Sequence, residues 1–321
     1  MRSIRGRGAL TAAAVLGALV MPASALAAAP TVTTGGAALV TQNSAKLKGT
    51  IDPNGTATSY IFQYGTTRLY EFKTAPLSAG AGNKAKRVSA VVGALAPATR
   101  YHYRLVGLRG SRTFFGKDKT FKTKPQPLGV SLAATPNPIA IGGQTTLAGT
   151  LTGTGNAGRR VQLQANAWPY TGGFVGGLVN DQITNAAGGF SFTLFPVNVN
   201  TQYKVLMPAK PNVASPIVVL GTVAKVTRHA KVVKRGKKRG LIRFSGRIRP
   251  ALDGAAVYIQ KLRKGIFTNI ALTTAVHTDK GYSRYSKRVG QRRGGRYRIV
   301  VVHGAHSPSV SKSIRRHHLR D

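Results

Sequence analysis

The sequence of 321 residues contains no cysteine, which excludes disulfide scaffolds, thiolate zinc sites and thiol catalysis. Acidic residues are also scarce: there are 7, against 48 lysines and arginines, for a formal net charge of +41. So few scattered carboxylates leave little from which to build a paired-carboxylate hydrolase or an oxygen-ligand metal site. This excess of positive charge attracts polyanions and disfavours cationic partners.

Catalytic motifs are missing as well. There is no Gly-x-Ser-x-Gly elbow and no phosphate-binding P-loop, and residues 125–222 contain no histidine. His277 and Asp279 flank a predicted hairpin turn, which explains them better than a catalytic pair does. His303 and His306, with His317–His318, could gather a transition metal, but the surrounding positive charge would repel it. We therefore expect no catalysis, no cofactor and no metal.

Long apolar runs are absent except near the N-terminus. Three arginines precede the apolar stretch 9–21, which is shorter than the roughly 20 residues that a membrane span needs. Small residues at Ala25-Leu26-Ala27 suit a cleavage site, so we predict a signal peptide over residues 1–27, with an uncleaved anchor as the alternative. After cleavage no stable membrane span remains, and the lack of cysteine favours bacterial export. The expected location is extracellular or loosely associated with the cell wall.

Beyond residue 27 the chain shows no convincing helical period. Short runs of Val, Ile, Thr, Tyr and Phe are separated by Gly, Pro, Asn and Asp about every 8 to 12 residues, a pattern typical of antiparallel sandwiches. We predict an all-β protein of three tandem antiparallel β-sandwich domains after the signal peptide. Their predicted ranges are 30–124, 128–222 and 223–321, with Pro125-Gln126-Pro127 as a stiff linker.

The first predicted domain carries a specific motif. Residues 95–103 have the sequence Leu-Ala-Pro-Ala-Thr-Arg-Tyr-His-Tyr, which resembles the Leu-x-Pro-x-Thr-x-Tyr-x-Tyr signature of fibronectin type III domains. The stretches 52–55 and 62–67 also resemble the version of this module common in secreted actinobacterial proteins. The resemblance implies that Leu95 and Tyr101 pin a corner before a core strand. A tryptophan frequent in the family is missing, and its candidate substitutes are Tyr60, Phe62 and Tyr64.

The second and third predicted domains are similar to each other. Residues 149–164 align with 246–260, at an offset of 97 at the start and 96 at the end, and residues 201–206 align with 295–300. In the same alignment Ser215-Pro216 corresponds to Ser307-Pro308. The pair resembles bacterial immunoglobulin-like sandwiches, although less specifically than the first domain resembles its family, and predicts two complete domains rather than solenoid repeats.

Positive charge is concentrated in the third domain, which has 26 basic and 3 acidic residues, against 15 and 3 in the first and 4 and 1 in the second. Strand alternation in 242–249 places Arg243, Arg247 and Arg249 on one face, where they could engage a row of phosphates or carboxylates. The alternative is a solvated edge strand protected from aggregation by its charge. Lys225, Lys264 and Lys312 are expected to be scattered cations outside this row. The predicted polyanion-binding residues are Lys234, Arg235, Lys237, Lys238, Arg239, Arg243, Arg247 and Arg249.

Aromatic residues suggest two further binding modes. Trp168, the only tryptophan, and Tyr170 lie in a glycine-rich segment and could stack on sugar rings, although a cluster capping the sandwich explains them better. Tyr282, Tyr285 and Tyr297 are interleaved with basic residues and could stack on bases of nucleic acid, which would be bound nonspecifically. Core positions in a sandwich are the more typical role for such tyrosines.

These patterns together predict a non-catalytic secreted or cell-surface protein. Its expected partner is an anionic cell-wall polymer or an acidic polysaccharide, held by the basic third domain. The alternatives are an accessory module of extracellular polysaccharide degradation and a purely structural spacer. Salt distinguishes cationic binding from aromatic sugar binding, since only the former weakens steeply as salt rises.

Overall fold

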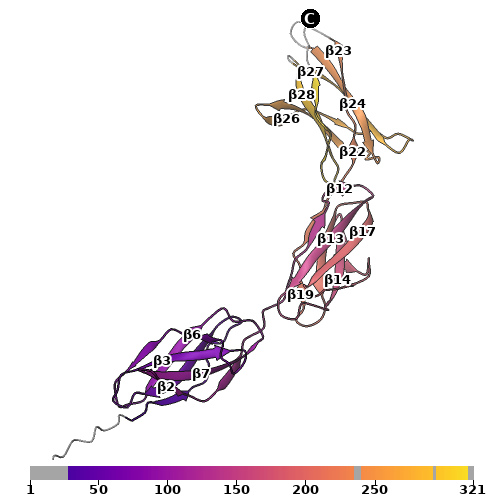
Figure 1. Cartoon of the computed structure of the whole chain (residues 1–321). Helices are drawn as coiled ribbons and strands as arrows, with labels where there is room; N and C mark the ends of the chain where they lie inside the picture. Colours follow the sequence, from indigo (N-terminus) through magenta and orange to yellow (C-terminus); the bar gives the residue numbers. More distant parts are fainter. Residues whose placement is uncertain (1–27, 235–239, 292–293, 317–321) are drawn as a thin grey trace, which may run out of the picture. The chain divides into compact units, whose positions relative to one another are not determined.

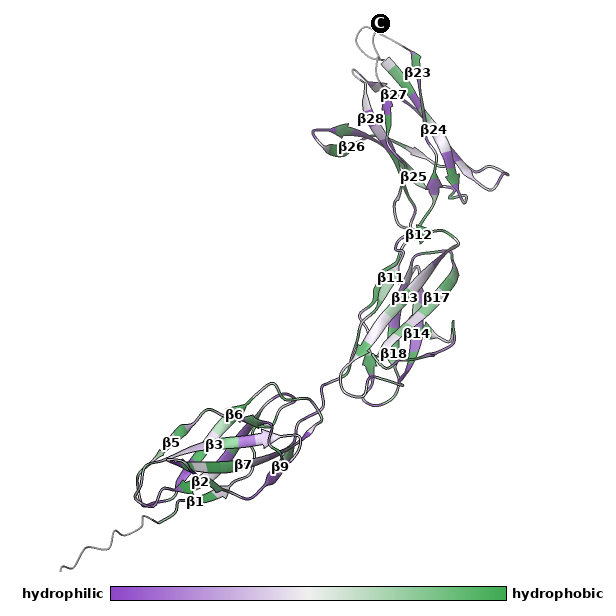
Figure 2. Ribbon diagram, viewed as in Figure 1, coloured by the Kyte–Doolittle hydropathy of each residue, from purple (hydrophilic) through white to green (hydrophobic). Residues whose placement is uncertain are grey.

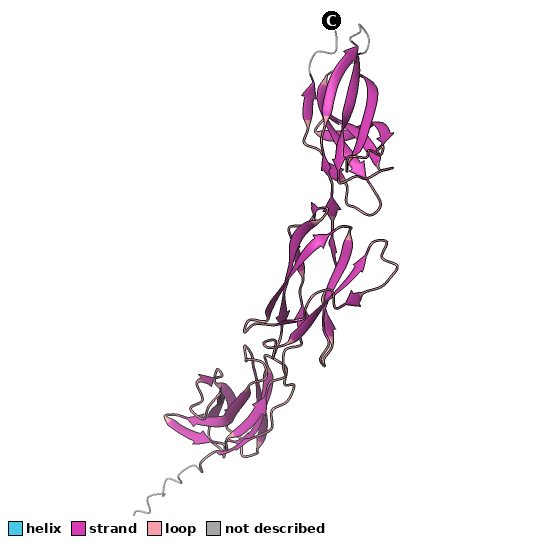
Figure 3. Cartoon of the chain, turned by 90° about the vertical axis from the view of Figure 1, so that its right-hand side faces the viewer, coloured by secondary structure: helices cyan, strands magenta, loops and turns pink. Residues whose placement is uncertain are grey.

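The computed structural model describes residues 28–234, 240–291 and 294–316, and this part of the chain consists of strands, turns and loops (Figure 3). None of these residues forms a helix long and apolar enough to cross a membrane. The predicted signal peptide, residues 1–27, lies outside the described residues. The chain divides into two compact units, Met1–Lys124 and Pro125–Asp321 (Figure 1).

The first unit is a sandwich of two antiparallel sheets. One has the order β1-β2-β6 and the other the order β4-β3-β7-β8, with β5 added to β3 and β9 to β7. Buried Leu47 of the first sheet and Phe62 and Tyr103 of the second belong to one core. The strands are β1 (Thr31–Thr34), β2 (Ala45–Asp52), β3 (Thr58–Gly65), β4 (Phe72–Lys73), β5 (Leu77–Gly80), β6 (Lys86–Val92), β7 (Arg100–Arg109), β8 (Arg112–Phe115) and β9 (Lys119–Lys122).

The corner predicted from the 95–103 motif is present. Leu95 and Tyr101 are both buried, and the Tyr101 hydroxyl accepts a hydrogen bond of 2.9 Å from the backbone N–H of Ala96. The Tyr101 ring stacks on Phe121, with ring centroids 5.6 Å apart. This hydroxyl reaching back to the preceding backbone is the tyrosine corner of immunoglobulin-like sandwiches. The resemblance is therefore confirmed at the level of the fold, and fully buried Phe62 occupies a central core position.

The second unit contains two further sandwiches, each with its own hydrophobic core. The second sandwich has the sheets β10-β13-β11, joined by β17, and β15-β14-β18-β19, joined by β16 and β20; β12 pairs with β21. Its strands are β10 (Gly129–Val130), β11 (Ala133–Thr135), β12 (Ile139–Ala140), β13 (Gly143–Thr152), β14 (Arg160–Ala167), β15 (Val175–Gly176), β16 (Gln182–Ile183), β17 (Gly189–Val197), β18 (Thr201–Met207), β19 (Val213–Ala214), β20 (Val218–Leu220) and β21 (Thr222–Val223).

The third sandwich has the same plan. Its sheets are β22-β24-β23, joined by β27, and β26-β25-β28-β29, joined by β30. The predicted fold of three all-β antiparallel sandwiches is thus confirmed, while the predicted domain boundaries stay predictions. Its strands are β22 (Lys225–Val226), β23 (His229–Lys234), β24 (Gly240–Arg249), β25 (Ala256–Arg263), β26 (Ile266–Thr274), β27 (Ser283–Gln291), β28 (Gly295–Val302), β29 (Ser309–Val310) and β30 (Ile314–Arg316).

The predicted repeat is confirmed by one pair of glycines and one pair of serines that occupy equivalent positions in the second and third sandwiches. A Cβ on Gly149 would lie 2.0 Å from the backbone oxygen of Ser131, and one on Gly246 would lie 2.0 Å from that of Thr227, so neither position has room for a side chain. The predicted match of Ser215 with Ser307 is wrong: Ser215 Oγ accepts the backbone N–H of Val205 on β18, and Ser311 Oγ accepts that of Ile299 on β28. Ser311 is therefore the structural equivalent of Ser215.

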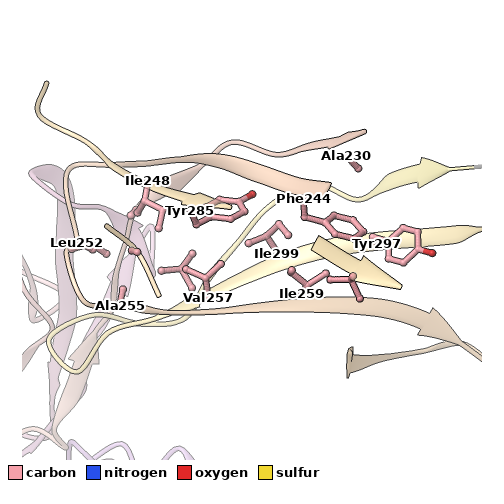
Figure 4. Close-up of a cluster of buried hydrophobic side chains, with 14 of the residues drawn as sticks. Ala230, Phe244, Ile248, Leu252, Ala255, Val257, Ile259, Tyr285, Tyr297 and Ile299 are labelled. Carbon is pink, nitrogen blue, oxygen red and sulfur yellow. The ribbon is translucent and has the colours of Figure 1, made fainter. Parts of the chain in front are cut away.

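Apolar side chains of both sheets fill the third sandwich (Figure 4). The Phe244 and Tyr297 rings lie 5.0 Å apart, and the Tyr285 hydroxyl donates a 2.8 Å hydrogen bond to the backbone oxygen of Thr227. Burial raises the pKa of Tyr297 to about 12 and also raises the pKa of Tyr285, so both phenols stay neutral. Their rings belong to the core and cannot stack on the bases of a nucleic acid.

Candidate polyanion-binding face

The outer side of the β22/β23–β24–β27 sheet is a cationic surface. Hydrophobic and hydrophilic residues alternate along β24 (Figure 2), with Ile242, Phe244 and Ile248 buried and Arg243, Arg247 and Arg249 exposed, as predicted. Because residues directly opposite each other in a sheet point to the same side, the register identifies the neighbours of these arginines on adjacent strands. We define the cationic sheet face by the exposed residues Lys225, Lys231, Lys234, Arg243, Arg247, Arg249, Arg284 and Arg288.

Like charges lie directly opposite one another on this face. Arg243 of β24 lies between Lys231 of β23 and Arg288 of β27. Arg247 lies opposite Arg284, and Lys225 of β22 lies opposite Arg249. Directly opposite Cβ atoms are about 4.5–5.5 Å apart, and like charges in this arrangement are destabilising. The sheet therefore holds several cations closer together than folding alone would favour.

No acidic side chain neutralises the face within the described part of the chain. There the recorded ion pairs of Asp and Glu involve Arg68, His102, Arg160 and His277, none of which belongs to the cationic sheet face. The two described acids of the third sandwich, Asp253 and Asp279, both contact His277. The charge of the face is thus available to an external anion.

A groove of about 610 Å³ lies on this face and is lined by three of its cations, Arg243, Arg247 and Arg284. Between the arginines it is lined by the polar side chains of His229, Ser245 and Ser286, which lie directly opposite one another on β23, β24 and β27. Tyr282 lies beneath the guanidinium groups of Arg247 and Arg249, whose Cζ atoms are 4.8 and 5.1 Å from the centroid of its ring. These cation–π contacts orient two arginines while leaving their N–H groups free to donate.

Four predicted binding residues lie on the face, namely Lys234, Arg243, Arg247 and Arg249. The other four, Arg235, Lys237, Lys238 and Arg239, lie outside the described residues. The expectation that Lys225 is a scattered cation is wrong, because β22 places it opposite Arg249. Arg284 was missed: alternation within 283–289 indicates that it points outward, but only the strand register shows that it faces Arg247.

Replacing Arg288 with Thr is expected to raise the free energy of unfolding of the third sandwich by about 0.2–1 kcal/mol at low salt, since it removes a like charge opposite Arg243. The gain should shrink as salt screens the exposed charges. Amide hydrogen exchange of β24 measures the effect, and Arg288→Lys, which keeps the charge, is the control. A loss of stability that does not depend on salt would show that these cations do not repel one another.

Trp168 and Tyr170 lie in the turn after β14. Trp168 is 42% exposed, and its ring lies beside Gly304, where a Cβ would come within 3.1 Å of the indole. Tyr170 is half-buried, and its backbone oxygen accepts a 3.1 Å hydrogen bond from the Asn166 side chain. The turn that contains Gly304 thus lies against the indole. Sugar stacking by this pair stays a prediction.

His277, Asp253 and Ser283 form a polar cluster without the order of a catalytic triad. In a triad the histidine lies between serine and carboxylate, whereas here Asp253 accepts from both Ser283 and His277, the latter at 2.5 Å. Hydrogen bonds from Ser283 and His277 lower the pKa of Asp253, and the bond to Asp253 raises the pKa of His277. Ser283 is fully buried, so no substrate can reach it. The described residues contain no group of three side chains suited to a metal ion.

No family model and no curated protein matches this sequence. Solved structures with some similarity include the sensor domain of the anti-sigma factor RsgI4 of Pseudobacteroides cellulosolvens, at 20% identity and TM-score 0.24, covering 30% of this chain and 89% of that one. The FN1-FN3 domains of chicken CNTN1 match at 13% identity and TM-score 0.30, over 90% and 99% of the two chains. A tetra-tandem repeat from the extending region of a large adhesion protein matches at 14% identity and TM-score 0.29, over 89% and 73%. These scores are low, and the fold is established by the strand pairing of the chain itself.

Proposed function

We propose that this chain is a non-catalytic extracellular protein that associates with an anionic polymer, a wall polymer or an acidic polysaccharide, through the cationic sheet face. The observation that carries the proposal is the set of directly opposed cations, such as Lys231, Arg243 and Arg288, which have no acidic partner among the described residues. Folding gains nothing from this arrangement. A polyanion laid along the groove would relieve the repulsion and accept hydrogen bonds from several guanidinium groups at once.

The spacing of the face suits a repeating ligand. Successive outward residues of β24 are about 6.5–7 Å apart, so Arg243, Arg247 and Arg249 present donors in a row rather than around a point. The groove is also open to solvent, unlike the enclosed cavity expected for a small molecule. Charged groups along a flexible polymer can therefore bind in succession, each releasing counterions.

The test measures binding of the full chain to hyaluronate and to a phosphodiester polymer, with dextran as the neutral control, over a series of salt concentrations. Binding to both acidic polymers is expected, and log K should fall with log salt with a slope of about −3 or steeper if four or more charges are contacted. Binding that is independent of salt concentration and extends to dextran would indicate aromatic contacts with sugars, and would favour the accessory role in polysaccharide degradation. No binding to any of the three would favour a structural spacer.

A further inference from the structure

A second groove lies on the outer side of the β1-β2-β6 sheet, in the first compact unit and therefore on a different unit from the cationic sheet face. Its volume is about 340 Å³. The proposed function assigns it no role. Its lining includes Gly35, Gly36, Lys48, Thr50, Arg87 and Ser89.

Alternation along β2 points Lys46, Lys48 and Thr50 outward, while Leu47 and Ile51 face the core. The register with β6 places Ser89 opposite Lys48 and Arg87 opposite Thr50. Arg87 is thus a diagonal neighbour of Lys48, about 7–8 Å away between Cα atoms, and both long side chains can reach one anion between them. The hydroxyl groups of Ser89 and Thr50 provide additional donors beside these cations.

The edge strand β1 ends next to this pair of cations. Strand β1 ends at Thr34, and after Gly35 the chain next meets β2 at the bridge between Ala38 and Lys46. Gly35 remains attached through its N–H, which donates 2.8 Å to the backbone oxygen of Lys48, and a Cβ there would lie 2.9 Å from that oxygen. Gly36 has open space where a side chain would project. The groove therefore has a wall of bare backbone that an anion can approach closely.

No described carboxylate pairs with the cations of this groove. The nearest carboxylate along β2 is Asp52, whose side chain accepts the N–H of Asn54 at 3.0 Å and is directed into the following turn. The ion pairs recorded for the described residues do not include Lys46, Lys48 or Arg87. Two cations, two hydroxyl groups and a backbone segment without side chains thus line one open groove.

We propose that this groove is a second anion-binding site, which takes one phosphate, sulfate or carboxylate group held by Lys48 and Arg87. The shared chemistry is an oxyanion that accepts from a guanidinium, an ammonium and a hydroxyl group. If the proposed function of the third sandwich also holds, one molecule would bind a polymer segment in each compact unit and could cross-link the two. The site does not depend on the proposed function of the third sandwich.

The test follows backbone amide NMR signals of the full chain during titration with inorganic phosphate and, in a second series, acetate. Saturating shifts are expected at Gly35, Gly36 and Ser89, and stronger binding of one probe identifies the preferred oxyanion. Lys48→Gln with Arg87→Gln should weaken binding about tenfold or more, because each charge-assisted hydrogen bond contributes on that order. The matched control is Arg112→Gln with Lys119→Gln, two exposed cations on the other sheet, which should leave the shifts unchanged.

Two results would overturn the proposal. One is small, non-saturating shifts spread over all basic residues, and the other is an equal effect of the groove variant and its control. Lys48→Arg retains the charge and should retain binding, which separates lost contacts from a damaged fold. Neutralising Arg243, Arg247 and Arg249 should leave these shifts intact, so failure of this site and failure of the cationic sheet face are distinguishable.

Discussion

Replacing Arg243, Arg247 and Arg249 together with Gln should weaken binding to an acidic polymer by about a hundredfold or more at low salt. Each charge-assisted contact is worth about 1 to 3 kcal/mol, and three such contacts lie in one row on β24. The salt dependence should become shallower by about 0.7 to 0.9 in the log–log slope for each lost contact. Binding isotherms against hyaluronate and a phosphodiester polymer, at low and moderate salt, measure both quantities.

The matched control replaces Lys264, Lys280 and Lys312 with Gln. These three residues are exposed, belong to the third sandwich and lie outside the cationic sheet face, so the net charge changes by the same amount. A small loss for the control beside a large loss for the β24 variant would support a built binding face. Equal small losses would reduce the proposal to diffuse electrostatic adhesion. The β24 variant should fold well, because it removes like charges that oppose one another.

Tyr101→Ala should lower the free energy of unfolding of the first sandwich by about 3 kcal/mol or more. The side chain is 5% exposed and stacks on Phe121, so truncation leaves a cavity as well as losing buried apolar area. Tyr101→Phe, which keeps the ring and loses only the bond from the Ala96 N–H, should cost about 1 kcal/mol or less. Chemical denaturation of the fragment 28–124, which we expect to fold cooperatively, provides the measurement.

The control for this series is Phe72→Ala in the same sandwich. Phe72 is 55% exposed, and its ring contact is with Tyr64 at 5.5 Å, so its truncation should cost less than about 1 kcal/mol. An unchanged free energy of unfolding in the Tyr101→Ala protein would contradict the stabilising role of the tyrosine corner. A fragment that does not fold alone would contradict the predicted boundary near Lys124.

The architecture is readable in the sequence because β-sandwiches depend on local signals. Alternation determines which side chains of a strand face the core, so the burial of Phe244 and the exposure of Arg243 follow from their positions alone. The 95–103 motif similarly predicts the Tyr101 corner, because its hydrogen bond spans only five residues. The repeat of the second and third sandwiches is visible because two copies of one pattern lie about 96 residues apart.

Partners across strands were decided by tertiary structure. Lys225 is 24 positions from Arg249 in sequence, yet β22 brings the two side chains opposite each other. Arg284 faces Arg247 for the same reason. The equivalent of Ser215 is Ser311, because the hydroxyl of Ser311 accepts the N–H of Ile299, although the matching Ser-Pro dipeptide in the sequence is Ser307-Pro308. Alternation specifies the side of a strand but not its register, and a shift in register changes every cross-strand neighbour. The sequence by itself therefore determined the sandwiches and the sign of their charge, whereas only the pairing of β24 with its neighbours assembled the cations into one face.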